Sequence, residues 1–465
     1  MQEFDFIVIG GGSAGLKAAR TAAKLGRKVA LAEERELGGE CFWAGCVPTK
    51  AMVRAADVWT QVRHSGQYGI HADVTKADFG EAMDYKNRVV KQLGGDGPDD
   101  GGLSKIGASY YPVQARFESP HEVRMGDEVI SGKCILIATG TIPAVPPIPG
   151  LEAAGYITNR EAVHLETLPK RLVVLGAGPI GLEFAQIFRR FGASVTVLGT
   201  GSQVLPKEDE QIAELAAQYL RDEGIEIYLN ASAGEVSLKN GAKRVHFEQN
   251  GVVKEIDCDE ILVATGRDAA LEGLNIEAAG VSYEKRCVHV DKHLRTNVPH
   301  ILAAGDIAGG YLFTHVASYE GRLVAMNAFT DQPEPFDHRV VPRCTYIDPE
   351  VASIGLTEKE AEARGADISV YDFSFADLDR AVIYGDTRGM VKIVADALNG
   401  LILGAHVIGP DASSVIAELA ICMRHNLPVR AIADTMHAYP SFPEAIEAAA
   451  LSAPSFRGQV EGAVG

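Results

Sequence analysis

Residues 5–15, DFIVIGGGSAG, combine an apolar strand with three spaced glycines, Gly10, Gly12 and Gly15, and the helix-like segment LKAARTAAKLG follows directly. A GxGxxG turn between a strand and a helix brings backbone N–H groups and a helix N-terminus close to a pyrophosphate. The next apolar run, KVALAE, ends at Glu33. This is near the spacing of about 20 residues at which a carboxylate accepts a hydrogen bond from a ribose hydroxyl. The stretch therefore predicts a Rossmann-like dinucleotide-binding domain.

The same pattern recurs at residues 171–188, RLVVLGAGPIGLEFAQIF, with Gly176, Gly178 and Gly181. Two fingerprints predict two bound dinucleotides. In the second repeat the strand ASVTVLG ends in Gly199 rather than in an acid, and no arginine follows nearby to hold a 2′-phosphate. The choice between NAD and NADP therefore stays open.

Three further strand patterns end in small or polar residues: ILIATG (135–140), ILVATGR (261–267) and HILAAGDIAGG (300–310). The third contains Asp306 directly after its strand. An aspartate there could cap a loop, but beside two fingerprints we favour a role in binding a cofactor hydroxyl.

Cys41 and Cys46 lie in GGECFWAGCVPTK, residues 38–50. Zinc requires more ligands than two cysteines, and no CxxC or nearby histidine pair supplies them. In a regular helix residues i and i+5 are too far apart for a disulfide, so the backbone must be distorted between them, and Gly45 permits this. Pro48 suits the first turn of a helix. Cys46 is therefore expected at a helix N-terminus, where the dipole and Lys50, four residues later, favour a thiolate.

Composition sets limits on the function. The 465 residues are 46% hydrophobic and 23% charged, with 44 Lys and Arg against 62 Asp and Glu. The net charge of −18 disfavours nucleic acid as a partner. No long apolar run or signal-like N-terminus is present, so we expect a cytoplasmic protein without a membrane partner. Seven cysteines form an odd, sparse set, which argues against a secreted disulfide framework. We expect the cysteines other than Cys41 and Cys46 to be core residues.

Taken together, these motifs resemble the class I pyridine nucleotide–disulfide oxidoreductases, a family of flavoproteins. The resemblance covers essentially the whole chain, and PTK after GCV is more similar to the dihydrolipoyl dehydrogenase and mercuric reductase branches than to glutathione reductases. It implies an α/β fold with two Rossmann-like domains and a C-terminal α+β dimerisation domain. The expected ranges are 1–150 and 271–340 for FAD, 151–270 for NAD or NADP, and 341–465 for the interface of a homodimer whose subunits share active sites.

The resemblance also implies roles for individual residues. Cys41 would be the sulfur that exchanges with substrate, Cys46 the charge-transfer thiolate against the flavin, and Lys50 would pair with Glu183 near the flavin. The expected catalytic residues are Cys41, Cys46, Lys50, Glu183, His437, Tyr439 and Glu444. The expected cofactor-binding residues are Gly10, Gly12, Ser13, Ala14, Gly15, Glu33, Glu34, Gly39, Lys50, Thr139, Gly140, Gly176, Gly178, Ile180, Gly181, Gly266, Arg267, Gly305, Asp306 and His315; no metal ligand is expected.

The C-terminal motif departs from the family pattern. Where relatives have two histidines and a glutamate, this chain reads HAYPSFPE, with His437, Tyr439 and Glu444. Tyr439 takes the place of the usual base, and a tyrosine is a poor general base at neutral pH. His437 is either a substitute base or a structural histidine. A tyrosine at this place is a feature that the chain shares with mercuric reductases, but it lacks their C-terminal cysteine pair. In addition, Pro179 replaces an aromatic residue that several relatives place over the flavin.

Three functional hypotheses follow. The leading one is an FAD-dependent, NAD(P)-linked dithiol/disulfide oxidoreductase like dihydrolipoyl dehydrogenase, acting on a small dithiol or a lipoyl carrier protein. The second is a metal-ion reductase of the mercuric type, with Cys41 and Cys46 as thiolate ligands. The third is a non-catalytic FAD-carrying subunit that binds a partner.

Overall fold

The computed structural model describes residues 1–74, 76–95, 100–239 and 241–453. It has an α/β fold, and the fold class predicted from the sequence is confirmed. The last part of the predicted interface domain, residues 454–465, lies outside the described residues. Within the described ranges, no helix combines the length and the apolar character needed to cross a membrane.

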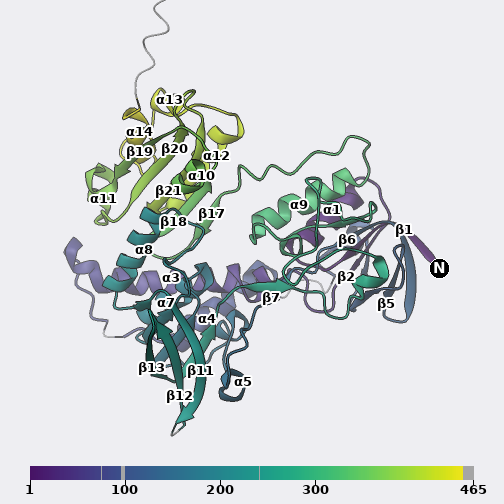
Figure 1. The fold of residues 1–465 in the computed structure, drawn as a ribbon, viewed down its shortest axis with the longest axis horizontal. Helices are drawn as coiled ribbons and strands as arrows, with labels where there is room; N and C mark the ends of the chain where they lie inside the picture. The colour runs from purple at the N-terminus through teal and green to yellow at the C-terminus, as the bar shows by residue number, and fades with distance from the viewer. Residues whose placement is uncertain (75, 96–99, 240, 454–465) are drawn as a thin grey trace, which may run out of the picture.

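The N-terminal sheet has the order β3-β2-β1-β6-β5-β4, and β16 pairs with β6. Its strands are β1 (Gln2–Ile9), β2 (Val29–Ala32), β3 (Ser109–Tyr111), β4 (Ala115–Phe117), β5 (Glu122–Met125), β6 (Glu128–Ile137) and β16 (Ile301–Ala303). Strand β1 lies between β2 and β6 and is parallel to both. Helices α1 (Ser13–Lys24) and α9 (Thr314–Asn327) pack on this sheet and on each other, at the right of Figure 1. Chain segments about 300 residues apart in sequence therefore build one domain.

A second parallel sheet has the order β10-β9-β8-β14. Its strands and helices are β8 (Arg171–Leu175), α7 (Pro179–Arg190), β9 (Ser194–Leu198), α8 (Glu210–Asp222), β10 (Glu226–Tyr228) and β14 (Glu260–Val263). A three-stranded antiparallel sheet beside it consists of β11 (Ala231–Lys239), β12 (Ala242–Gln249) and β13 (Val252–Cys258). A two-stranded ribbon of β7 (Thr141–Pro143) and β15 (Arg267–Ala269) links the two parallel sheets. The short helices α5 (Leu151–Ala154) and α6 (Asn159–Ala162) follow β7.

The first glycine of each fingerprint has the same backbone conformation. Gly10 and Gly176 have φ values of +105° and +115°. A Cβ at Gly10 would lie 2.3 Å from the Ala138 carbonyl oxygen, and one at Gly176 would lie 2.2 Å from that of Ala264. Only glycine satisfies both conditions, because it tolerates positive φ and leaves room for the neighbouring strand. The turn therefore brings the chain against the strand that ends in ATG in both halves.

The C-terminal part is a five-stranded antiparallel sheet, order β17-β18-β21-β20-β19, covered by helices (upper left in Figure 1). Its elements are β17 (Arg343–Thr345), β18 (Glu350–Gly355), α10 (Glu358–Ala363), β19 (Ile368–Ser374), α11 (Asp379–Tyr384), β20 (Met390–Asp396), β21 (Ile402–Gly409), α12 (Ala412–Arg424), α13 (Val429–Ala433) and α14 (Glu444–Leu451). Alternate residues of β18, β20 and β21 share one apolar core with α12 and α14. This accounts for the α+β architecture that the sequence predicts.

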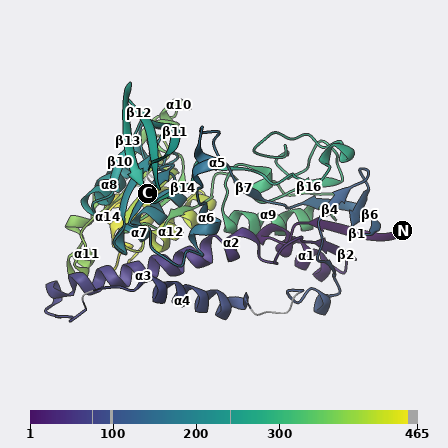
Figure 2. The same ribbon diagram turned by 90° about the horizontal axis from the view of Figure 1, so that it is seen from below.

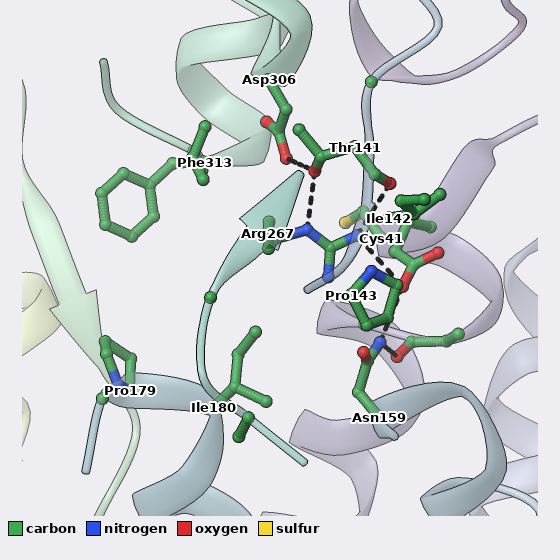
Figure 3. A pocket seen from close by; sticks show the side chains of 18 of the residues that line it. Cys41, Thr141, Ile142, Pro143, Asn159, Pro179, Ile180, Arg267, Asp306 and Phe313 are labelled. Atoms are coloured by element: carbon green, nitrogen blue, oxygen red, sulfur yellow. Dashed lines mark hydrogen bonds and ion pairs between the residues drawn. The ribbon is translucent and has the colours of Figure 1, made fainter. Parts of the chain in front are cut away.

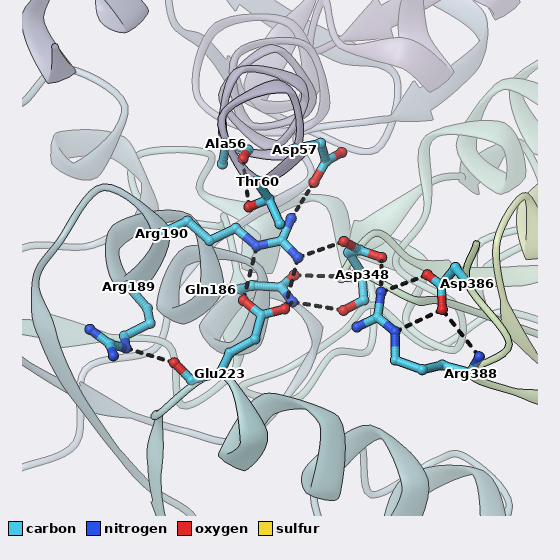
Figure 4. Close-up of polar contacts among 10 residues, drawn as sticks. All are labelled: Ala56, Asp57, Thr60, Gln186, Arg189, Arg190, Glu223, Asp348, Asp386 and Arg388. Carbon is cyan, nitrogen blue, oxygen red and sulfur yellow. Dashed lines mark hydrogen bonds and ion pairs between the residues drawn. The ribbon is translucent and has the colours of Figure 1, made fainter. Parts of the chain in front are cut away.

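Helix α3 (Cys46–His64) runs beside α4 (Phe79–Val90) along the lower edge of Figure 2. At its middle, Arg190 of α7 is buried among three carboxylates, donating to Asp57 at 2.5 Å, Glu223 at 2.9 and 2.8 Å, and Asp348 at 2.6 Å (Figure 4). Arg388 approaches Asp348 from the C-terminal sheet at 3.0 Å. This network fixes α3 relative to the second sheet and the C-terminal part, and so fixes the cysteine at its start.

Candidate functional site

A cavity of about 2090 Å³ lies where the carboxyl ends of both parallel sheets meet the start of α3. Typical small-molecule sites measure roughly 300–1,000 Å³, so this volume suits more than one bound group. Most of the predicted residues line it: Gly12, Ser13, Ala14, Glu33, Glu34, Gly39, Cys41, Cys46, Lys50, Thr139, Gly140, Gly176, Gly178, Ile180, Glu183, Gly266, Arg267, Gly305, Asp306 and His315. Gly10, Gly15 and Gly181 shape the turns behind it rather than lining it.

The first glycine turn has the features of a dinucleotide site. The Gly11 backbone N–H donates to Glu33 at 2.6 Å, which fixes the carboxylate at the end of β2. The hydroxyl of Thr139 is buried in the cavity wall without a hydrogen-bond partner within the described residues. Asp306 accepts from Thr141 at 3.2 Å, and burial raises its pKa. A polyhydroxylated nucleotide such as FAD fits these groups, since it offers partners for both the unpaired hydroxyl and the buried carboxylate.

The second glycine turn differs from the first in two matched positions. Ala177 stands where the first turn has Gly11, and Gly199 stands where it has Glu33. A Cβ at Gly11 would lie 2.9 Å from the Glu33 Cβ, and a Cβ at Gly199 would lie 2.9 Å from that of Ala177. In each turn, therefore, only one of the two facing positions, 11 and 33 in the first turn or 177 and 199 in the second, has room for a side chain. Lys207, which the sequence prediction did not consider, lines the cavity at this end.

Cys41 and Cys46 lie at the junction of α2 (Gly39–Trp43) and α3. The helix is broken at Ala44 and Gly45, and a Cβ at Gly45 would lie 3.0 Å from the Glu40 carbonyl oxygen and 3.1 Å from the Cys41 Cα. The glycine therefore allows the two turns to approach each other. Both cysteines are free thiols in the structure, and each has a strong effect on the pKa of the other. The predicted distortion at Gly45 and the helix start at Cys46 are both confirmed.

The two sulfurs have opposite electrostatic environments. The pKa of Cys46 is lowered to about 6, first by the hydrogen bond from Cys41 and then by Thr314 and Lys50, against the effect of burial. Thr314 Oγ1 lies 3.3 Å from Cys46 Sγ at the start of α9. The pKa of Cys41 is raised, because its thiol proton is held by the Cys46 sulfur and because it is buried. At neutral pH the pair is therefore a Cys46 thiolate beside a Cys41 thiol.

Lys50 and Glu183 form the predicted pair, with Lys50 Nζ 2.6 Å from the buried Glu183 carboxylate. The other oxygen of Glu183 accepts from the Tyr346 backbone N–H at 2.9 Å, and Lys50 lies 4.7 Å from the Tyr346 ring centroid. Helix α3, helix α7 and the C-terminal part therefore meet at one ion pair on the cavity wall. Tyr346 was not predicted, because nothing in the local sequence marks a residue near β17 as part of this site.

Glu40, the residue before Cys41, connects the cysteine loop to its surroundings. It accepts from Asn159 at 2.8 Å and from Arg160 at 2.9 Å, and it lies 3.3 Å from Arg267. Arg267 in turn donates to the side-chain hydroxyl and to the backbone carbonyl oxygen of Thr141, as Figure 3 shows. Arg267 thus both lines the cavity and holds the ribbon between the two parallel sheets. The sequence prediction gave it only a cofactor-binding role and missed Glu40.

Comparisons with known proteins agree with this geometry. The family model for pyridine nucleotide-disulphide oxidoreductase matches residues 4–321, and its dimerisation domain matches residues 341–450. The chain belongs to this family. A Bacillus subtilis dihydrolipoyl dehydrogenase is 34% identical, covering 97% of this chain and 98% of that protein. A Bacillus cereus mercuric reductase is 32% identical over 97% of this chain and 71% of that protein.

Among solved structures, the HOCl-induced flavoprotein disulfide reductase RclA from Escherichia coli superposes with a TM-score of 0.86 at 32% identity, covering 98% of this chain and all of that one. A Cu(II) complex of RclA is also similar, with a TM-score of 0.84, 32% identity and coverage of 97% and 99%. Members of this family use FAD and NAD or NADP, as predicted. The dimerisation domain indicates a homodimer.

The family's C-terminal motif lies apart from the cavity within one protomer. Glu444, one of the expected catalytic residues, accepts from the Ser441 backbone N–H at 2.5 Å. Tyr439 is exposed and donates to Asp379 at 2.8 Å. The side chain of His437 is 6% exposed, with Nε2 3.0 Å from Glu418 and Nδ1 3.0 Å from the Thr435 carbonyl oxygen. Both ring nitrogens are engaged, which favours the structural reading of His437.

The expectation that the remaining cysteines are core residues holds only in part. Cys134, Cys258 and Cys422 are buried. Cys344 and Cys287 are only half-buried and lie in the cavity wall. Burial raises the pKa of Cys344 to about 12, so its thiol stays protonated at neutral pH.

Proposed function

We propose that this family member is an FAD-dependent, NAD(P)-linked dithiol/disulfide oxidoreductase of the dihydrolipoyl dehydrogenase type. The observation that supports it most directly is the unequal pair of Cys41 and Cys46 in a cavity shared with two dinucleotide-type turns. The substrate would be a small dithiol or a lipoyl group on a carrier protein.

The unequal pKa values of the two sulfurs assign their roles in thiol–disulfide exchange. When Cys41 and Cys46 are joined as a disulfide, a substrate thiolate attacks the Cys41 sulfur and the Cys46 sulfur leaves as a thiolate. Attack occurs in this direction because the sulfur with the lower pKa is the better leaving group. The helix N-terminus, Lys50 and Thr314 stabilise the negative charge on Cys46. The second substrate thiol, after losing its proton, attacks the mixed disulfide and releases Cys41, which leaves substrate as a disulfide and both cysteines reduced.

Bound FAD and nicotinamide nucleotide supply the redox chemistry that accepts the two electrons from this dithiol. In this proposal Glu33, Thr139 and Asp306 would hold FAD, and Gly178 and Lys207 would hold the nicotinamide nucleotide. In this proposal Lys50 and Glu183 keep one fixed positive charge beside the Cys46 thiolate, and the partner subunit's C-terminal segment closes the substrate side.

A second candidate is reduction of a soft metal ion held by Cys41 and Cys46. A relative named mercuric reductase matches almost the whole chain, and one of the similar solved structures is a Cu(II) complex of RclA. The tyrosine at position 439 is also a feature of mercuric reductases, whereas this chain lacks their C-terminal cysteine pair.

A steady-state screen tests these proposals. The FAD-loaded protein is assayed with dihydrolipoamide and NAD or NADP, and with mercuric or cupric ion and NADH or NADPH. We expect dihydrolipoamide turnover that Cys41→Ser and Cys46→Ser both abolish. Turnover with metal ions alone would support the second candidate. A protein that binds FAD but is inactive in every assay would favour the non-catalytic subunit.

A further inference from the structure

A short β-hairpin outside the redox pair brings together three metal-binding side-chain types. Tyr283 and Val288 form an antiparallel bridge. The Glu284 backbone N–H donates to the Cys287 carbonyl at 2.8 Å, and that of His289 donates to the Ser282 carbonyl at 3.1 Å. Side chains alternate between the two faces of a hairpin, and residues opposite each other across it share a face. Glu284, Cys287 and His289 therefore project on the same side.

The distances among their donor atoms match those around a small cation. Cys287 Sγ lies 3.3 Å from Glu284 Oε1, and His289 Nε2 lies 3.8 Å from the same oxygen. All three donor atoms lie within 4.8 Å of one another. In a tetrahedral zinc site with bonds of about 2.0–2.3 Å, ligand atoms lie roughly 3.3–3.8 Å apart. The side chains need only small adjustments to place one cation between them.

The backbone holds this arrangement in position. The Val288 backbone N–H donates to the Ile307 carbonyl at 2.8 Å, directly after the cofactor-type residue Asp306. Cys287 packs against Gly309, where an added Cβ would lie 3.0 Å from the cysteine Cβ. Lys285, a cation next to the cluster in sequence, pairs with Asp268 at 3.0 Å. The cysteine is thus fixed by the fold.

We propose that Glu284, Cys287 and His289 form a binding site for a borderline-soft divalent cation, with Zn²⁺ as its best match. Thiolate, imidazole and carboxylate are all common zinc ligands, and water would complete the tetrahedron. Binding releases the Cys287 thiol proton to solvent and forms a zinc–sulfur bond, with no change of oxidation state. Because His289 and Glu284 are 56% and 63% exposed, the site is open and exchanges its ion readily. The proposal goes beyond the redox function and does not depend on it.

The test must separate this site from Cys41 and Cys46. Zn²⁺ binding is measured by calorimetry on the FAD-loaded Cys41→Ser/Cys46→Ser protein, and Co²⁺ difference spectra report thiolate coordination. We expect one equivalent of metal, with cobalt–thiolate charge-transfer absorption. Cys287→Ser and His289→Ala in this background should each weaken binding by more than about tenfold, since even outer-shell changes often cost 10–100-fold.

His246→Ala serves as the matched control, because His246 also faces a carboxylate, Glu255 at 3.8 Å, but no cysteine of the described residues joins them. It should leave binding unchanged. In the otherwise native protein, Zn²⁺ should slow alkylation of Cys287 as located by mass spectrometry, and His289→Ala should remove that protection. Absence of saturable binding, or binding and protection that survive both cluster variants, would overturn the proposal.

Discussion

The ionisation of Cys46 in the reduced protein is the most direct measure of the site's electrostatics. Its pKa is lowered from 9.0 to about 6, so at pH 7 about nine-tenths of Cys46 should be thiolate, whereas an unperturbed thiol would be about one-hundredth ionised. Since the shift is downward, the thiolate is present above pH 6 and is lost as the pH falls through that value. Cys41, whose pKa is raised, should remain a thiol across the same range.

Two substitutions should move this pKa in opposite directions. Lys50→Met removes a positive charge and should raise the Cys46 pKa by about 1 unit, the lower end of the usual effect of a nearby opposite charge, because the Cys41 and Thr314 hydrogen bonds lower that pKa more than Lys50 does. Glu183→Gln removes a negative charge and should lower it. Methionine and glutamine are close in size to the side chains that they replace, so packing in the cavity wall should be preserved. The Tyr346 backbone N–H can still donate to the side-chain oxygen of a glutamine at position 183.

The assay is the rate of alkylation of each cysteine against pH in the reduced, FAD-loaded protein, with the modified sulfur located by tandem mass spectrometry. Reactivity follows the thiolate, so the inflection reports the pKa. In the same samples, a long-wavelength charge-transfer band to FAD should follow the Cys46 inflection and vanish in Cys46→Ser. An inflection near the ordinary thiol value, faster alkylation of Cys41, or shifts of the same sign in both charge variants would contradict the assignment of Cys46 as the stabilised thiolate.

Four further predictions concern other parts of the molecule. Gly199→Glu alone should not improve the ratio of kcat/KM for NAD to that for NADP, because the new Cβ would crowd Ala177. Adding Ala177→Gly should raise this ratio at least about tenfold. A full gain from Gly199→Glu alone would show that Ala177 does not restrict position 199. Glu40→Gln should lower the free energy of unfolding by about 1.5–3 kcal/mol in urea titrations, as it weakens charged hydrogen bonds to two arginines. Arg190→Met should cost about 3–5 kcal/mol in the same titration, since three carboxylates lose their cation; an unchanged midpoint would show that the network is not stabilising. Dihydrolipoamide oxidation should be slow near pH 7 and rise with pH, and Tyr439→His should raise the neutral rate and flatten the rise; a fast, pH-independent wild type would contradict this.

The features that depend on local geometry could be predicted from the order of residues alone. Gly10 and Gly176 adopt positive φ against a neighbouring carbonyl oxygen, a requirement that short-range spacing already expresses. The broken helix at Gly45 and the start of α3 at Cys46 follow equally from glycine, proline and the five-residue interval between the cysteines. Such features could be predicted because the interacting atoms lie within a few residues of one another.

The distant groups that surround those local features could be identified only from the folded chain. Thr314, 268 residues from Cys46 in sequence, contributes to the stabilisation of its thiolate, and Tyr346 contacts both Lys50 and Glu183. Glu40 contacts arginines from two later segments, and Glu444 accepts from the Ser441 backbone N–H of its own loop. A hydrogen bond or ion pair depends on distances of a few ångströms, which the order of residues along the chain does not specify, so these contacts exist only once the sheets and helices have packed.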